Sequence, residues 1–259
     1  MLSLNENQRA EVLSGLSDAE AAPLLLELAS TASESMLNFT LWTFPQYEAG
    51  WCHELICAEL DQFLADVVAK KSPRLMILAP PRSGKTELVS RRFPAYVFGK
   101  HPDLSIIAAS YSSDLAGRNN RDVQRIIDSD EYREVFPGTE LFGKNIRTLA
   151  HGQYLRNSEI FEIVNHAGSY RGAGVGCGIT GMGAHILSID DPIKDFKEAR
   201  SKVVRDSVWD WYASTAYTRL APGGGVIIIL TRWNEDDPAA RILSQTESGE
   251  GDKFKVVMN

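Results

Sequence analysis

Residues 74–86 read Arg-Leu-Met-Ile-Leu-Ala-Pro-Pro-Arg-Ser-Gly-Lys-Thr, and this stretch decides the fold. The apolar run at 74–78 predicts a buried strand, and the residues after 86 are compatible with a helix. A strand, a loop ending in Gly-Lys-Ser/Thr and a helix together form the context of a phosphate-binding loop, in which backbone N–H groups and the helix N-terminus surround phosphate oxygens. The sequence therefore predicts a nucleoside triphosphate site, with Lys85 on the β and γ oxygens and Thr86 on Mg²⁺.

The composition of the loop supports this reading with one departure. The opening position is Ala79 where a phosphate-binding loop usually has glycine, so Ala79 must keep a negative φ. The alternative is a surface turn that carries a lysine. The residues predicted to contact the nucleotide from the loop are Pro81, Arg82, Ser83, Gly84, Lys85 and Thr86.

A second motif follows about a hundred residues later, where a short apolar run ends in Asp190-Asp191-Pro192. Magnesium prefers oxygen ligands and retains several waters, so one carboxylate, Asp190, suffices to assist it. Asp191 is then available to orient and deprotonate water. The alternative is that Asp-Asp-Pro merely caps a helix that begins near Lys194.

A third feature is the apolar run at 226–230, which is preceded by three glycines and followed by Thr231-Arg232. A polar side chain at the end of this predicted strand would face the γ-phosphate. P-loop ATPases of the additional-strand type carry a polar sensor at this position, and by that likeness we expect Thr231 to sense hydrolysis and Arg232 to carry the signal outward. An ordinary strand end with an exposed arginine is the alternative.

Length and composition indicate a folded α/β protein. The chain has 259 residues, of which 44% are hydrophobic and 24% charged. Its apolar runs are far shorter than the roughly twenty residues that span a bilayer, so we expect no membrane association. Three cysteines without paired spacing argue against a disulfide framework or zinc site. A net charge of −7 argues against a general nucleic-acid coat, so any DNA contact must be local.

Alternating strand and helix patterns predict a mainly parallel central sheet flanked by helices. Helical patterns at 3–14 and 17–37 form an N-terminal lead-in, and 48–69 reads as an amphipathic helix. Residues 159–166 and 169–183 are polar and glycine-rich, which indicates a hairpin-like excursion beside the nucleotide. Residues 194–220 read as one long or broken helix, whose basic side chains are interleaved with acids and so favour a solvated charged face.

The ordered set of motifs resembles the large terminase subunit of tailed double-stranded DNA bacteriophages, from about Pro45 onward. The likeness rests on Pro-Pro-Arg-Ser-Gly-Lys-Thr-Glu-Leu-Val-Ser at 80–90, Ala-Ala-Ser-Tyr-Ser at 108–112, Arg-Gly at 171–172 with Gly-Ile-Thr-Gly at 178–181, Ile-Asp-Asp-Pro-Ile-Lys at 189–194, and Thr-Arg-Trp-Asn-Glu-Asp-Asp at 231–237. The resemblance implies a P-loop NTPase of the additional-strand type that binds ATP and Mg²⁺.

The resemblance also implies roles for single residues. Asp190 and Thr86 would hold the metal, Asp191 would be the catalytic carboxylate, and Thr231 would begin the coupling motif. Arg82 resembles the arginine that many terminases carry inside the loop, where it stabilises charge on the γ-phosphate as an arginine finger does.

Two further assignments follow from the resemblance. The family commonly has Gly-Arg-Gly-Ala-Asp before the acidic strand, whereas this chain has Gly-Met-Gly-Ala-His at 181–185, so an arginine at position 182 is absent. We propose Arg171 as the substitute that reaches a neighbouring subunit's site. Trp51 and His53 resemble part of an adenine pocket, although an aromatic residue at helical spacing is more often part of the core.

The expected organisation is a helical lead-in at 1–44 and a P-loop ATPase domain at 45–259, with the C-terminal nuclease domain of the family absent from this chain and no nuclease activity. The implied function is an ATP-driven translocase of double-stranded DNA that acts with portal protein and small terminase subunit at the procapsid portal vertex, in the cytoplasm of the infected bacterial host. A homo-oligomeric ring, a pentamer in the family, is expected there, with a monomer in isolation left open. Two rival functions are a helicase-like nucleic-acid remodeller and a nucleotide-gated assembly module with little turnover.

Overall fold

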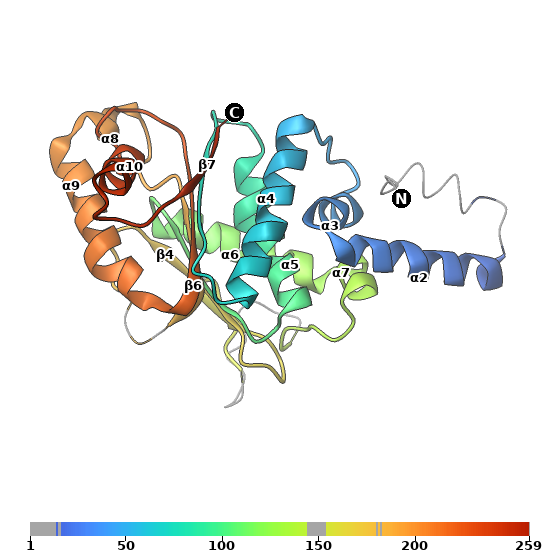
Figure 1. Cartoon of the computed structure of the whole chain (residues 1–259). Coiled ribbons are helices and arrows are strands. Elements are labelled where there is room, and N and C mark those ends of the chain that lie inside the picture. Colours follow the sequence, from blue (N-terminus) through green and yellow to red (C-terminus); the bar gives the residue numbers. More distant parts are fainter. Residues whose placement is uncertain (1–13, 15–16, 144–153, 180, 182, 259) are drawn as a thin grey trace.

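A mainly parallel sheet forms the centre of the computed structural model, which describes residues 14, 17–143, 154–179, 181 and 183–258 (Figure 1). The strand order among these residues is β3-β4-β2-β5-β6-β1-β7, with β3 antiparallel to β4 and all other pairs parallel. The strands are β1 (Arg74–Leu78), β2 (Ser105–Ser110), β3 (Ile160–Glu162), β4 (Ser169–Gly174), β5 (Ala184–Asp190), β6 (Leu220–Leu230) and β7 (Lys255–Met258).

The strand order confirms the additional-strand architecture. The strand before the phosphate-binding loop, β1, and the strand that ends in the acidic pair, β5, are not neighbours, because β6 pairs with both of them. In register, Leu78 lies opposite Leu230, and Asp190 lies opposite Ile229. The three motif-bearing strands therefore end at the same edge of the sheet.

Alternate side chains of each strand enter two separate apolar cores. Ile106 and Ala108 of β2 face the first core, whereas Ile107 and Ala109 face the second. The first face is covered by α4 (Trp51–Val68), the π-helical turn η1 (Glu87–Arg92), α5 (Phe93–Lys100) and α6 (Ser113–Asp128). The second face is covered by α9 (Lys202–Trp211), η2 (Tyr212–Ala216) and α10 (Pro238–Ser248). The short α8 (Phe196–Arg200) precedes α9, and η3 (Tyr217–Arg219) follows η2.

The N-terminal helices pack beside the first face. These are α2 (Asp18–Glu34) and α3 (Met36–Thr43), which meet α7 (Asp130–Val135) in a small separate cluster around Trp42. The indole Nε1 of Trp42 donates to the Glu131 carbonyl at 3.0 Å. The predicted helix at 3–14 falls almost entirely outside the described residues. No helix in the described part of the chain is long and apolar enough to cross a bilayer.

Two expectations about the middle and end of the chain were wrong. The hairpin-like pairing itself is confirmed, because β3 and β4 are antiparallel neighbours. The segment after 169 is nevertheless not a separate excursion, because β4 pairs with β2 over six residues inside the main sheet. A Cβ at Gly172 would lie 3.0 Å from the Ala116 carbonyl oxygen, so the glycine permits α6 to pack directly on β4. The three glycines at 223–225 lie within β6 and do not precede it. A Cβ at Gly225 would lie 2.4 Å from the Phe63 ring, so here too glycine admits a helix.

Candidate nucleotide site

Lys85 lies at the centre of the candidate site, in the loop between β1 and η1. Its side chain is almost fully buried, and its ammonium donates to three acceptors. Nζ lies 3.1 Å from the Ala79 carbonyl oxygen, 2.5 Å from Thr231 Oγ1 and 3.1 Å from Asp191 Oδ2. The three predicted motifs therefore meet at one ammonium group, although they are far apart in the sequence.

Asp191 reaches this ammonium because the chain turns sharply after β5. Successive side chains of a strand point to opposite faces, so Asp190 and Asp191 would diverge if the strand continued. Asp191 adopts φ +42°, which is unusual for a residue with a side chain. Its carboxylate then accepts the Thr231 backbone N–H at 2.8 Å. The alternative that Asp-Asp-Pro caps the next helix is wrong, because Asp195 caps α8 by accepting from the Glu198 N–H.

Asp190 is held by two hydroxyl groups from the segment that follows the loop. Ser90 Oγ donates to Asp190 Oδ2 at 2.7 Å, and Thr86 Oγ1 donates to Oδ1 at 3.4 Å. Thr86 and Ser90 are four residues apart, so both hydroxyls lie on the same face of the helical turn. Burial raises the pKa of Asp190 to about 6, and the Ser90 hydrogen bond opposes this rise. Sequence reasoning missed Ser90, although its spacing from Thr86 was a usable signal.

The Asp190 and Thr86 pair fits a magnesium ion of the kind that P-loop proteins bind. Such an ion takes one carboxylate and one hydroxyl from the protein and completes its shell with phosphate oxygens and water. The described residues contain no cluster of three or more His, Cys, Asp or Glu side chains that could hold a metal. The fit to magnesium rests on the Asp190 carboxylate and the Thr86 hydroxyl alone.

His53 and Tyr47 pack against the loop itself. His53 accepts the Gly50 N–H at Nδ1 and donates from Nε2 to the Ser83 carbonyl, both at 2.9 Å, which fixes the ring orientation. Gly84 has φ +79°, and a Cβ there would lie 3.0 Å from both His53 Nε2 and Tyr47 Oη. Ser83 Oγ and Tyr47 Oη are buried with no hydrogen-bond partner among the described residues. Both hydroxyls are donors that could pair with a phosphate oxygen at this loop.

Three predicted residues lie outside this cluster. Arg82 is exposed at the loop tip with φ +61°, whereas Ala79 is not among the described residues with positive φ, as predicted. Trp51 is the first residue of α4 and is 68% exposed. Arg171 lies in the middle of β4, opposite Ile107 and three residues before the strand end, so it is away from Lys85. Position 182 lies outside the described residues.

The end of β6 continues into a polar turn that fixes α10. Asp237 caps α10 by accepting the Ala240 N–H at 2.9 Å, and it pairs with Arg232. Asp236 pairs with Arg205 at 3.1 Å and with Arg241 at 2.8 Å. Both carboxylates therefore have structural partners at the start of α10.

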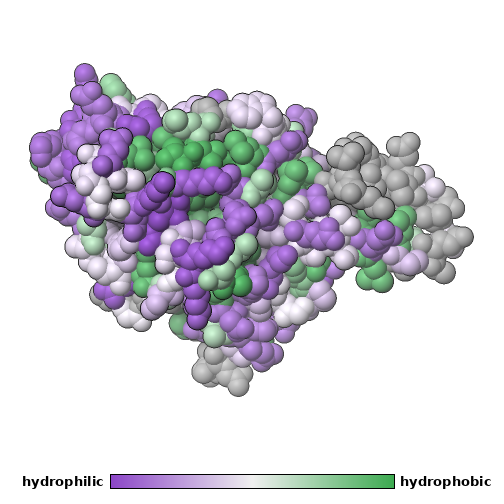
Figure 2. All heavy atoms as spheres, viewed as in Figure 1, coloured by the Kyte–Doolittle hydropathy of each residue, from purple (hydrophilic) through white to green (hydrophobic). Residues whose placement is uncertain are grey.

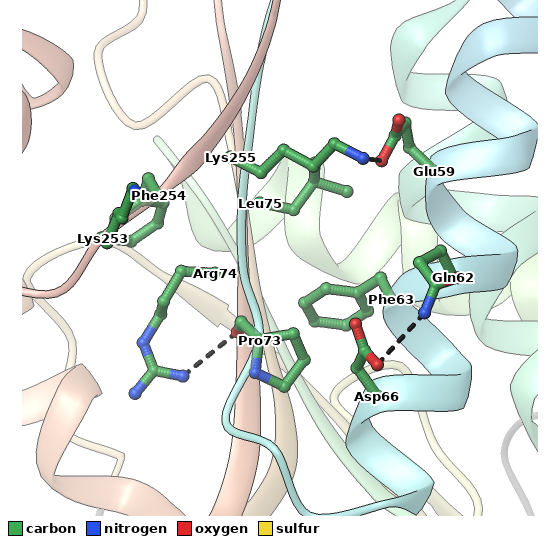
Figure 3. A pocket seen from close by; sticks show the side chains of 10 residues that line it. All are labelled: Glu59, Gln62, Phe63, Asp66, Pro73, Arg74, Leu75, Lys253, Phe254 and Lys255. Atoms are coloured by element: carbon green, nitrogen blue, oxygen red, sulfur yellow. Dashed lines mark hydrogen bonds and ion pairs between the residues drawn. The ribbon is translucent and has the colours of Figure 1, made fainter.

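A cavity of about 340 Å³ lies between α4 and strands β1 and β7, and Figure 3 shows its lining. An ion pair of 2.5 Å between Lys255 Nζ and Glu59 Oε2 borders it. Arg74 and Leu75, the first residues of β1, also line the cavity. The phosphate-binding loop follows the other end of β1, so this cavity is separate from the candidate nucleotide site.

Comparison with known proteins identifies the family. Residues 76–252 match the family described as terminase large subunit, T4likevirus-type, N-terminal. The chain belongs to the terminase large subunit family. This match spans all three motifs of the candidate site, and the sheet topology is that of the P-loop NTPase fold. A search of curated proteins found no match.

Two solved phage terminases illustrate the structural likeness. The large terminase of bacteriophage HK97 is 12% identical with a TM-score of 0.47, and the match covers 80% of this chain and 38% of that one. A mutant of the large terminase ATPase domain of Thermus phage P74-26 is 18% identical with a TM-score of 0.44, covering 75% of this chain and 69% of that one. The terminase chain described here thus spans well under half of the HK97 protein.

Proposed function

We propose that this terminase chain is an ATPase motor domain, which hydrolyses ATP to move double-stranded DNA into a procapsid. The observation that carries the proposal is the convergence of Lys85, Asp191 and Thr231 at one edge of the sheet, with Asp190 held beside Thr86. Family membership supplies the DNA-packaging context.

The contacts of Lys85 support a change of partners when ATP binds. The Lys85 ammonium forms an ion pair with Asp191 at 3.1 Å. A triphosphate would compete for the same ammonium, because the loop lysine of this fold contacts the β and γ oxygens. Asp191 would then lose its ion-pair partner and accept a proton from the attacking water. Bound Mg²⁺, held by Asp190 and Thr86, would neutralise charge on the phosphates.

The remaining site residues are assigned from their positions. Thr231 contacts both Lys85 and Asp191, so it is placed to detect the loss of the γ-phosphate. Arg82, at the exposed loop tip, is assigned to the γ-phosphate in the same subunit. His53 supports the loop through Ser83, and the exposed Trp51, the first residue of the same helix, is assigned to the adenine base.

Assembly on the procapsid belongs to the same proposal. We assign residues 45–259 to the ATPase domain and 1–44 to its helical lead-in. A homo-oligomeric ring would bind the portal protein and act with the small terminase subunit at the portal vertex in the host cytoplasm. Arg171 is the candidate that acts in trans, and its position in the middle of β4, away from Lys85, supports a role at a subunit contact over one in its own site. Full DNA-stimulated hydrolysis by Arg171→Ala would remove this assignment.

The test is phosphate release by the purified chain, with and without linear duplex DNA. The proposal expects Mg²⁺-dependent hydrolysis that DNA increases and that Asp191→Asn abolishes without loss of ATP-analogue binding. Tight nucleotide binding with negligible hydrolysis under all conditions, including high protein concentration, would favour the assembly module. Hydrolysis increased by single-stranded but not duplex DNA would favour a helicase-like remodeller.

A further inference from the structure

The segment directly after β5 carries an exposed cationic face. Asp191 is followed by Pro192 and Ile193, which are buried, and then by α8. Ile193 packs with Ala199 and Val208 in an apolar cluster that ties α8 and α9 together. A ligand bound at α8 would therefore be connected to Asp191 through a short, packed segment of the chain.

The acidic side chains of this segment are less exposed than its basic side chains. Asp195 and Glu198 are half-buried, and both accept backbone N–H groups, from Glu198 and Lys194 respectively. Lys194, Lys197 and Arg200 are exposed, and none of the three forms an ion pair within the described part of the chain. Each acid therefore directs an oxygen at the backbone of its own segment and not at a basic side chain, and three bases against two acids leave a formal excess of one positive charge here.

The exposed Phe196 gives the face a second unusual feature. Its side chain is 52% exposed, and the Arg200 guanidinium lies over its ring at 5.0 Å from the centroid. Stacking on an aromatic face holds a guanidinium in place and leaves its N–H edges available for oxygen acceptors. Figure 2 shows hydrophilic side chains gathered at the upper left, over α8 and α9.

We infer that Lys194, Lys197 and the Phe196-supported Arg200 form a contact site for the phosphate backbone of duplex DNA. The inference rests on the proposed function, since it names the surface by which that motor holds its substrate. A motor that moves any sequence needs phosphate contacts, which carry no sequence information. The chain has a net charge of −7, so a phosphate backbone requires such a local cationic face.

The direct test is binding of a fluorescent 30-base-pair duplex to the whole chain, measured by anisotropy over a range of salt concentrations. The altered chain carries Lys194→Gln, Lys197→Gln and Arg200→Gln together. The matched control carries Lys70→Gln, Lys71→Gln and Lys253→Gln, which are also exposed and lie at the opposite end of the sheet, near the starts of β1 and β7. Both triple variants lose the same formal charge.

A plot of log K against log salt concentration has a negative slope for DNA binding, and loss of three phosphate contacts should reduce the magnitude of this slope by about 3. The inference expects this loss in the α8 variant, together with weaker binding to unrelated sequences, and an unchanged slope in the control. Equal effects in both variants would mean that only net charge matters and would overturn the inference. So would undetectable DNA binding by the unaltered chain at low salt, or a change in oligomeric state with an unchanged slope, which would make the face a contact between copies.

The failure of this inference is distinguishable from failure of the proposed function. Binding of an ATP analogue and basal phosphate release without DNA should be the same in the α8 variant and the unaltered chain. An α8 variant with normal DNA binding would remove the surface assignment and leave the ATPase proposal intact. A chain that binds no nucleotide would remove the proposed function.

Discussion

Substitution of Ser90 by alanine tests whether its hydroxyl tunes the metal-binding carboxylate. The Ser90 to Asp190 hydrogen bond is 2.7 Å long, and both side chains are buried. A hydrogen bond to a charged group contributes about 1.5–3 kcal/mol, and about 1.4 kcal/mol corresponds to one pKa unit. Loss of this donor should therefore raise the pKa of Asp190, already about 6, by a further ~1–2.

The consequence is a defect that depends on pH, because a protonated carboxylate does not bind Mg²⁺. With a pKa near 7–8, about half to nine-tenths of Asp190 would be protonated at pH 7, so apparent Mg²⁺ affinity should fall roughly 2- to 10-fold there. Near pH 9 the affinity should return to that of the unaltered protein. The assay is Mg²⁺-dependent binding of a fluorescent ATP analogue between pH 6 and 9.

Two control substitutions sharpen this experiment. Ser90→Thr keeps a hydroxyl and should retain most of the affinity. Ser188→Ala removes another buried hydroxyl from the same strand as Asp190, with which it shows no hydrogen bond, and should not change the pH profile. A defect of equal size at all pH values, or none at any pH, would refute the reasoning.

Three further substitutions have defined outcomes. Gly84→Ala should reduce nucleotide binding and lower the melting temperature, because φ +79° costs an alanine about 1–2 kcal/mol and its Cβ would press on His53 and Tyr47 at 3.0 Å; unchanged binding would contradict the loop geometry. Asp190→Asn should stabilise the nucleotide-free protein at pH 8 while abolishing Mg²⁺ dependence. The raised pKa means that the native state binds more protons than the unfolded state between pH about 4 and above 6. The ionised carboxylate therefore lowers stability as the pH rises through this range, by at most ~3 kcal/mol. Equal melting curves of Asp190→Asn and the unaltered protein at pH 8 would count against this effect of burial. Asp237→Ala should lower stability by about 1–2 kcal/mol through loss of the α10 cap, measured by urea unfolding, and a loss below about 0.5 kcal/mol would show that the cap is dispensable.

The sequence predicted the chemistry-bearing strand ends well, because each combines an apolar run with a polar terminus. The runs ending at Leu78, Asp190 and Leu230 are strands β1, β5 and β6, and their ends meet at Lys85. Local pattern was sufficient there, since a buried parallel strand is apolar on both faces.

Features that depend on packing between distant segments were not predictable. The sequence of β4 reads as part of a hairpin-like excursion, and its place inside the main sheet had no local signal. Only the close approach of α6 explains Gly172. The role of Ser90 could be predicted only if it were known that η1 lies against the end of β5. The positive φ of Asp191 also has no signal in the local sequence, because the contacts that accompany it are with Lys85 and Thr231, which are distant in the chain.

The central claim is that Lys85 binds the phosphates of a nucleotide and gives up Asp191 when it does so. The most direct measurement is the dissociation constant of a non-hydrolysable ATP analogue with Mg²⁺ for Lys85→Ala beside Asp191→Asn. We predict that Lys85→Ala loses measurable binding, whereas Asp191→Asn binds at least as tightly as the unaltered chain because the ammonium no longer has a competing carboxylate. Unchanged affinity in Lys85→Ala would contradict the claim.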